Sequence, residues 1–215
     1  MGAAALTRSA VALLGLALLL APIPAAAHER SGHGHGTGTD VATQVARAPE
    51  ASSEALDIGG PFSLIDHEGR ARSDADYRGD YLLVYFGYTA CPYTCSTALI
   101  NLAGALDELS AEGVELTALF ITVDPEYDTP DRLAHFVAAI HPRLVGLTGT
   151  TEQARAVLEA YRVEARPAVD KGAYARLIDH SPFTYLMGPK GGFLTLFPPI
   201  VPPQRMAAII RGYLH

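Results

Sequence analysis

The sequence is poor in cysteine and in charge. It has only two cysteines among 215 residues, and charged residues make up 18%. Its lysines and arginines form no cluster and the formal net charge is −7, so nucleic acid is not expected as a partner. Hydrophobic residues make up 49%, and the length suits one packed domain with an extension, or two very small domains.

No strongly apolar run reaches the roughly 20 residues that span a bilayer. Residues 10–21 (AVALLGLALLLA) are apolar, and Pro22 and Pro24 interrupt the segment that follows. Ala25–Ala27 fit the small-x-small pattern at which a secretory signal is cleaved. We therefore expect a signal peptide over residues 1–27 and an exported, periplasmic protein. The alternative is a retained anchor that tethers the protein to the outer face of the inner membrane.

Beyond the signal, residues 28–55 are rich in Gly, Ala, Ser and Thr and show no apolar periodicity. They predict a flexible tether. A folded domain is expected over residues 56–215.

Apolar runs and helical patterns alternate along this domain. Near-continuous apolar runs at 81–88 and 114–124 predict strands that are buried on both faces. The order β-α-β-α-β-α-β-β-α implies a central sheet covered by helices. The remaining predicted elements are a hairpin at 61–72, helices from Pro92 to Gly113, from Pro130 to about Ile140, from Thr150 to Tyr161 and from Pro203 onward, and strands at 144–149, 183–188 and 193–197.

Cys91 and Cys95 lie where the strand at 81–88 leads into a helix. In an exported protein, two cysteines usually form a structural disulfide. At a helix N-terminus, however, the helix dipole stabilises a thiolate. Residues four apart on a helix have Cα atoms about 6 Å apart on one face, which suits a disulfide but also lets both sulfurs bind one metal ion. The pair therefore predicts a disulfide staple, a redox pair or part of a metal site.

A metal held by two thiolates needs a further ligand, and His180 is the candidate. It comes just before the predicted strand at 183–188, and in a thioredoxin-like sheet the loop before that strand faces the start of the cysteine-bearing helix. Two thiolates and one imidazole suit Cu(I), or Cu(II) with an added ligand, whereas structural zinc requires four protein ligands. A lone loop histidine is more often a hydrogen-bonded residue, and its combination with the two cysteines favours copper.

Four segments in order resemble the SCO/SenC family of copper-binding, thioredoxin-like proteins: YFGYTACPYTC, ITVDPEYDTPDRL, LVGLTGTTEQ and DHSPFTYLMGPKGGF. The resemblance extends from about Phe62 to Tyr213. It implies an α/β protein with a thioredoxin-like fold, a central mixed sheet flanked by helices. It also implies that Cys91, Cys95 and His180 bind one copper ion.

The resemblance implies an exported copper chaperone that helps to assemble the CuA centre of cytochrome c oxidase. Its partners would be cytochrome c oxidase subunit II or another cuproprotein, together with an upstream periplasmic copper chaperone or a thioredoxin-like reductant. The alternative is a thiol–disulfide oxidoreductase that keeps the acceptor cysteines reduced, with Cys91 attacking and Cys95 resolving. A metallochaperone is favoured over an enzyme. TACPYT is also similar to thiol peroxidases, but these need an arginine near the cysteine and the local motif has none.

Tyr93 is a departure from the resemblance, because the family commonly has an acidic residue at this position. Several acidic residues near the motifs have two interpretations. Asp124, Glu126 and Asp128 follow the strand at 114–124 and either orient a partner or cap turns and loops. Asp179 either sets the tautomer of the neighbouring imidazole or belongs to a turn.

Three histidines in the predicted tether form a second candidate copper-binding feature. If cleavage follows Ala27, His28 becomes the N-terminal residue, and its amine and imidazole can chelate copper together. His33 and His35 would add to this auxiliary binding. The alternative is a polar linker whose histidines bind nothing.

Overall fold

The computed structural model describes residues 57–91, 94–168 and 177–214 of the chain, all within one compact unit. For residues 94–96 it describes the helical backbone alone. The predicted signal peptide, tether and tether histidines lie outside the described residues, as do Pro92 and Tyr93.

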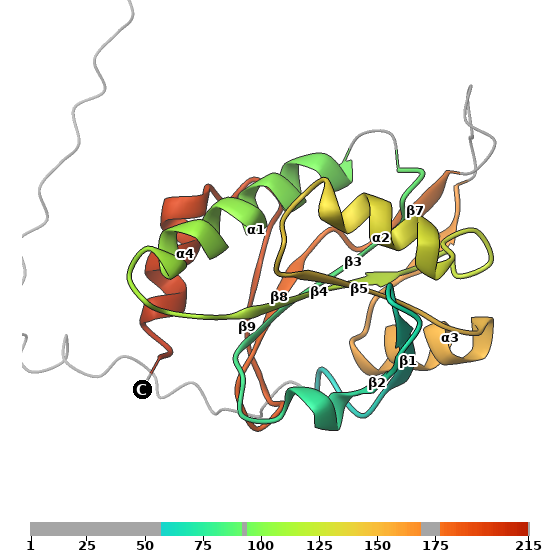
Figure 1. Cartoon of the computed structure of the whole chain (residues 1–215), viewed down its shortest axis with the longest axis horizontal. Helices are drawn as coiled ribbons and strands as arrows, with labels where there is room; N and C mark the ends of the chain where they lie inside the picture. Colours follow the sequence, from blue (N-terminus) through green and yellow to red (C-terminus); the bar gives the residue numbers. More distant parts are fainter. Residues whose placement is uncertain (1–56, 92–93, 169–176, 215) are drawn as a thin grey trace, which may run out of the picture. The chain divides into compact units, whose positions relative to one another are not determined.

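A seven-stranded sheet forms the centre of the domain (Figure 1), with strand order β2-β1-β5-β4-β3-β8-β9. β3 pairs in parallel with β4, which pairs in parallel with β5, whereas β8 pairs antiparallel to β3. The sheet is therefore mixed, as predicted. Its strands are β1 (Ser63–Asp66), β2 (Ala71–Ser73), β3 (Leu82–Gly87), β4 (Thr117–Thr122), β5 (Leu144–Thr148), β8 (Thr184–Met187) and β9 (Phe193–Phe197).

Helices cover both faces of the sheet. α1 (Thr94–Ser110), α2 (Pro130–Ala138) and α4 (Pro203–Arg211) contribute to one buried cluster, and α3 (Thr151–Ala160) contributes to the other. Strand β3 lies between the two clusters, so Leu83 and Tyr85 enter the first and Leu82, Val84 and Phe86 the second. This position explains the continuous apolar run, because side chains of a strand alternate between its faces.

Three features differ from the sequence predictions. β6 (Ala165–Pro167) and β7 (Ile178–His180) form a separate antiparallel two-stranded sheet, and a short 3₁₀ helix, η1, spans Asp74–Tyr77. Helix α1 ends at Ser110, before the predicted Gly113. Gly113 has a φ of 79°, a left-handed conformation that favours glycine after a helix, so it marks the turn beyond the helix end.

Among the described residues, no helix has both the length and the apolar character needed to cross a membrane.

Candidate metal centre

Cys91 lies in a tight turn between strand β3 and helix α1. The strand ends at Gly87 and the helix begins at Thr94. The backbone N–H of Cys91 donates to the carbonyl of Tyr88 over 3.2 Å, which closes the turn. The Cys91 side chain is half-buried and packs against the core cluster beneath α1. The first cysteine is thus held at the strand-to-helix junction that the sequence predicts.

The carboxylate of Asp128 anchors this turn from another part of the chain. Its side chain is buried and accepts hydrogen bonds from the N–H of Thr89 (3.0 Å), the hydroxyl of Thr89 (2.5 Å) and the hydroxyl of Thr122 (2.6 Å). Thr122 is the last residue of β4, so the carboxylate ties the turn to the end of a central strand. Asp128 therefore supports the cysteine-bearing turn.

His180 is the last residue of β7, a strand rather than the expected loop. Its ring makes edge-on contacts with two buried tyrosine rings: the centroid of Tyr85 is 6.3 Å away at 83° and that of Tyr88 is 5.9 Å away at 82°. The Nδ1 atom of His180 lies 3.2 Å from the carbonyl of Ser181. Because a carbonyl only accepts, this contact is a hydrogen bond in the tautomer whose Nδ1–H donates, and in that tautomer Nε2 carries the lone pair that a metal ion requires.

Tyr88 connects the two described candidate ligands. Its carbonyl accepts from the N–H of Cys91, and its ring contacts that of His180. Its hydroxyl accepts from the backbone N–H of Ile178 over 3.1 Å, so the same residue also holds strand β7. The cysteine-bearing turn and the histidine-bearing strand, far apart in sequence, therefore meet at one buried residue.

The remaining candidates are placed differently. The side chain of Cys95 lies outside those described, and the described residues contain no group of three His, Cys, Asp or Glu side chains that could hold a metal ion. Asp179 is exposed, and neighbouring residues of a strand project to opposite faces, so its carboxylate is directed away from the face that carries His180. Asp124 is buried, and its carbonyl accepts from the N–H of Tyr127 and of Asp128.

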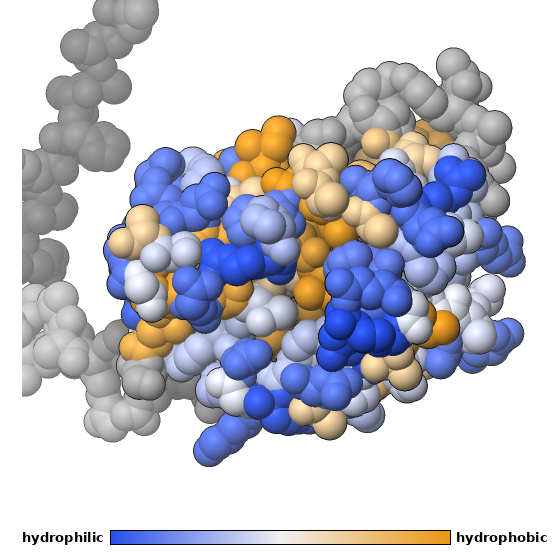
Figure 2. Space-filling view, in the orientation of Figure 1, coloured by the Kyte–Doolittle hydropathy of each residue, from blue (hydrophilic) through white to orange (hydrophobic). Residues whose placement is uncertain are grey.

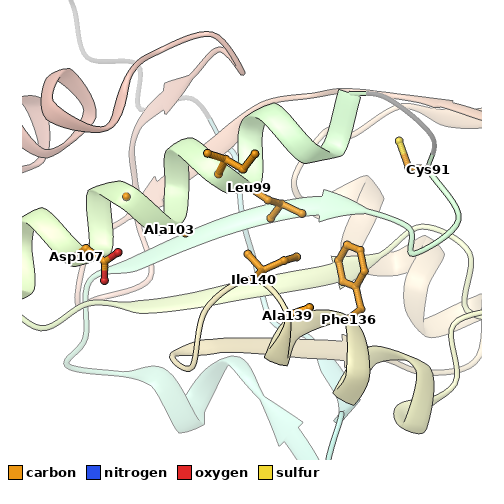
Figure 3. A pocket seen from close by; sticks show the side chains of 9 residues that line it. Cys91, Leu99, Ala103, Asp107, Phe136, Ala139 and Ile140 are labelled. Atoms are coloured by element: carbon orange, nitrogen blue, oxygen red, sulfur yellow. The ribbon is translucent and has the colours of Figure 1, made fainter.

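A pocket of about 450 Å³ opens beside Cys91, between helices α1 and α2 (Figure 3). The ring of Phe136 forms part of its wall and packs against Phe120 of β4, with centroids 4.9 Å apart. The pocket's other lining residues are Leu99, Ile100, Ala103, Gly104, Asp107, Ala139 and Ile140.

Sequence reasoning missed Tyr88 and Thr89 as supporting residues of the site. Tyr88 ends an apolar run, which indicates burial but not the identity of its neighbours. Thr89 lies in the short segment before Cys91, and its hydrogen-bond partner Asp128 lies 39 residues away in the sequence. The only sequence feature that could have indicated a role for Tyr88 and Thr89 is that they lie close to Cys91 in the chain.

The sheet order, the helices on both faces and the cysteine at the β3–α1 junction define a thioredoxin-like α/β protein, as predicted. Residues 50–215 match the SCO1/SenC family, and the chain belongs to that family.

Individual relatives agree with this assignment. The chain is 43% identical over 142 residues to human "Protein SCO1 homolog, mitochondrial", covering 65% of this chain and 47% of that protein. It is 40% identical over 162 residues to "Protein SenC" of Rhodobacter capsulatus, covering 75% of this chain and 73% of that one. The chain spans about half the length of several of the curated relatives it matches.

Among solved structures, Arabidopsis thaliana ScoI with copper bound superposes with a TM-score of 0.68 at 36% identity. The superposition covers 71% of this chain and 95% of that structure. The similarity therefore extends over almost all of the solved domain.

Proposed function

We propose that this chain is an exported copper chaperone of the SCO type. It binds one copper ion through the thiolates of Cys91 and Cys95 and the imidazole of His180. It acts in the periplasm and helps to assemble the CuA centre of cytochrome c oxidase, delivering copper to subunit II or to another cuproprotein.

The observation that carries this proposal is that Tyr88 contacts both Cys91 and His180. One residue holds the turn of the first thiol and contacts the imidazole ring, so two of the three proposed ligands share a neighbour. The solved ScoI proteins of Arabidopsis thaliana and Bradyrhizobium japonicum, each 36% identical to this chain, both have copper bound. Their similarity supports copper as the cargo.

The proposed donor set suits transient binding of copper. Two thiolates and one imidazole are soft ligands in a trigonal set that favours Cu(I). A partner can displace them one at a time, because each incoming thiolate or imidazole replaces a ligand of the same kind. The half-buried position of Cys91 limits access to one side, which would direct the partner toward the pocket between α1 and α2.

Thiol–disulfide exchange is a second candidate function, and the position of Cys91 favours it. Cys91 precedes the 17-residue helix α1, and a thiol near a helix N-terminus is stabilised as the attacking thiolate. Cys95 would then act as the resolving thiol. A protein with this activity would reduce the cysteines of the acceptor before they receive copper.

X-ray absorption of the reduced protein reconstituted with Cu(I) tests the copper site. We expect one copper ion per chain with two sulfur ligands and one imidazole nitrogen. Cys91→Ala, Cys95→Ala and His180→Ala should each lower the affinity for Cu(I), measured by competition with a chromogenic Cu(I) chelator. Asp80→Asn, which alters an exposed carboxylate outside the site, is the control.

Two outcomes separate the candidate functions. Full affinity for Cu(I) in His180→Ala overturns the proposed ligand set. Loss of copper in that variant is the result that the proposed ligand set requires. Reduction of a model disulfide that persists in the same variant would support thiol exchange as an activity of the two cysteines, and a Cys91–Cys95 disulfide that no dithiol reduces would count against it.

A further inference from the structure

The pocket between α1 and α2 begins at the proposed copper ligand. Cys91 lies at one end of it, and the side chains of Leu99 and Phe136 line it from opposite helices (Figure 3). Its volume of about 450 Å³ lies in the range, roughly 300–1,000 Å³, of sites that hold ligands through apolar walls. A protein that exchanges copper or a disulfide with Cys91 would approach along this groove.

The surface around the groove is apolar. Ile100 of α1 is 66% exposed, and among the described residues only two other large hydrophobic side chains, Ile65 and Ile200, are exposed. Apolar residues gather between α1 and α2 in the space-filling view (Figure 2). The groove therefore presents apolar walls and an apolar rim to a partner.

The other end of the groove is acidic. The side chain of Asp107 is 74% exposed and lines both this pocket and a neighbouring one that includes Glu108. Asp107 contacts the ring of His141 at 3.2 Å, and Glu108 accepts from the amide of Gln204 at 3.1 Å. In the part of the chain that the structure describes, neither carboxylate is paired with a lysine or arginine. Arg211, which pairs with Glu112, also attracts Glu108 electrostatically. Asp107 is therefore the carboxylate at the end opposite Cys91 that favours a cationic group.

We propose that this groove binds a segment of the partner protein in which apolar side chains are followed by lysine or arginine. The apolar side chains occupy the walls formed by α1 and α2, and the basic group lies beside Asp107. The segment thereby presents its own copper-binding or cysteine residue to Cys91. This inference rests on the proposed function and names the kind of partner that the same site recognises.

Two other occupants fit less well. A second copy of this chain carries a formal net charge of −7, so the acidic end would repel it. An acidic partner is disfavoured for the same reason. Apolar burial and opposite charge therefore select a basic, partly apolar segment.

Disulfide-exchange rates with synthetic peptides test this specificity. The protein, purified from the exporting cell and carrying Cys95→Ser, is reduced and mixed with peptides whose single cysteine is activated as a disulfide with thionitrobenzoate. The Cys91 thiolate attacks the peptide sulfur, the new protein–peptide disulfide forms as the old disulfide breaks, and thionitrobenzoate leaves as a thiolate with the electron pair. The thiol proton goes to the buffer, and absorbance of the released thiolate gives the rate.

Three peptides of equal length separate the contributions of shape and charge. One carries apolar residues followed by two lysines, the second ends in two glutamates instead, and the third replaces the apolar residues with serine. We expect the apolar, lysine-ended peptide to react about tenfold faster than either of the others at low salt. Ile100→Glu should remove the preference for apolar residues, and Asp107→Lys should remove or invert the preference for lysine.

Matched variants and a small reagent provide the controls. Ile200→Glu and Asp80→Lys make the same changes at exposed positions outside the groove and should keep both preferences. Dithiodipyridine, a neutral small disulfide that needs no groove, gives the intrinsic reactivity of Cys91 in each variant, and each peptide rate is divided by it. Equal rates for the three peptides, or preferences that survive Ile100→Glu and Asp107→Lys, would overturn the proposal.

Other outcomes distinguish this inference from the proposed function. A protein that binds one Cu(I) ion but shows no peptide preference keeps the copper function and overturns the docking groove. A protein that shows the peptide preference but binds no copper keeps the docking groove and overturns the copper function. Analytical ultracentrifugation of wild type and Ile100→Glu, which measures the oligomeric state, completes the test. If wild type is a dimer and Ile100→Glu is a monomer, the groove binds a second copy of the chain and the proposal is overturned.

Discussion

The ring of Tyr88 lies edge-on to that of His180, with centroids 5.9 Å apart, while the carbonyl of Tyr88 accepts from Cys91. The hydroxyl of Tyr88 also accepts from the N–H of Ile178, at the start of the strand that carries His180. A change at this one side chain should therefore alter the imidazole position while leaving all three proposed ligands in the chain.

Tyr88→Phe is predicted to weaken copper binding. The ring remains, but the N–H of Ile178 loses its acceptor, so β7 and the imidazole at its end become less well held. Loss of a supporting contact of a metal ligand typically lowers metal affinity about 10- to 100-fold. Competition with a Cu(I) chelator measures this change, and Tyr88→Leu, which also removes the ring, should lower the affinity further.

Tyr77→Phe is the matched control for that prediction. Tyr77 is a buried tyrosine whose hydroxyl has no hydrogen-bond partner within the described part of the chain. Removal of that hydroxyl should leave copper affinity unchanged. Equal affinities in Tyr77→Phe, Tyr88→Phe and wild type would show that Tyr88 does not position the imidazole.

Asp128→Asn is predicted to destabilise the cysteine-bearing turn. The carboxylate accepts from three donors on Thr89 and Thr122, whereas an amide presents a donor to at least one of them. Leaving a buried donor unsatisfied costs roughly 1–3 kcal/mol of unfolding free energy, which denaturant titration measures. Amide hydrogen exchange at Thr89 and Cys91 should also become faster.

A double-mutant cycle checks the origin of that effect. The double variant Thr89→Ala/Asp128→Asn should lose less unfolding free energy than the sum of the losses in the two single variants, because both changes remove the same contacts. Strict additivity would contradict direct coupling between the two residues. Asp80→Asn, at an exposed position, should be close to neutral.

The long apolar runs and the helical spacing predicted most of the fold. Leu99, Leu102 and Leu106 recur at helical intervals and are all buried, because one face of α1 packs on the sheet. The short sheet of β6 and β7 was not predictable in this way. Its three-residue strands contain charged residues and a proline, and no period of two can be recognised over so short a span.

The candidate site was predicted by residue type rather than by its contacts. Cys91 and His180 could be selected because thiols and imidazoles bind metals. The role of Tyr88 depends on pairing between segments that lie far apart in sequence, and that of Asp128 on a contact across 39 residues. Neither contact leaves a local pattern, so both required the three-dimensional structure.

Asp66 is predicted to make the stability of the protein sensitive to acid. Burial alone would raise the pKa of this fully buried carboxyl, but hydrogen bonds from the backbone N–H of Arg70 and from the side chains of Arg72 and Arg70 outweigh it and hold the pKa below its usual 3.8. The folded state therefore binds fewer protons than the unfolded state. The stabilisation is present above about pH 3.8 and is lost as the pH falls through the lower pKa of the folded state.

Asp66→Asn should remove this acid sensitivity and lower stability at neutral pH by about 1–3 kcal/mol. Urea titrations of variant and wild type at several pH values measure the difference between them. The difference should shrink as the pH falls below about 3.8. A constant difference across this range would show that Asp66 does not titrate with folding.

Gly104→Ala is predicted to force helices α1 and α4 apart. A Cβ atom at Gly104 would lie 2.7 Å from Cγ and 2.9 Å from Cβ of Pro203, the first residue of α4. The proline ring is stiff, so the helices must shift, and overpacking of this kind costs about 1–3 kcal/mol. Thermal unfolding should show a lower Tm.

Gly192→Ala is the control, because a Cβ atom there meets nothing within 4 Å, and its Tm should be unchanged or slightly raised. An unchanged Tm in Gly104→Ala would mean that α4 can move away from α1 without loss of packing.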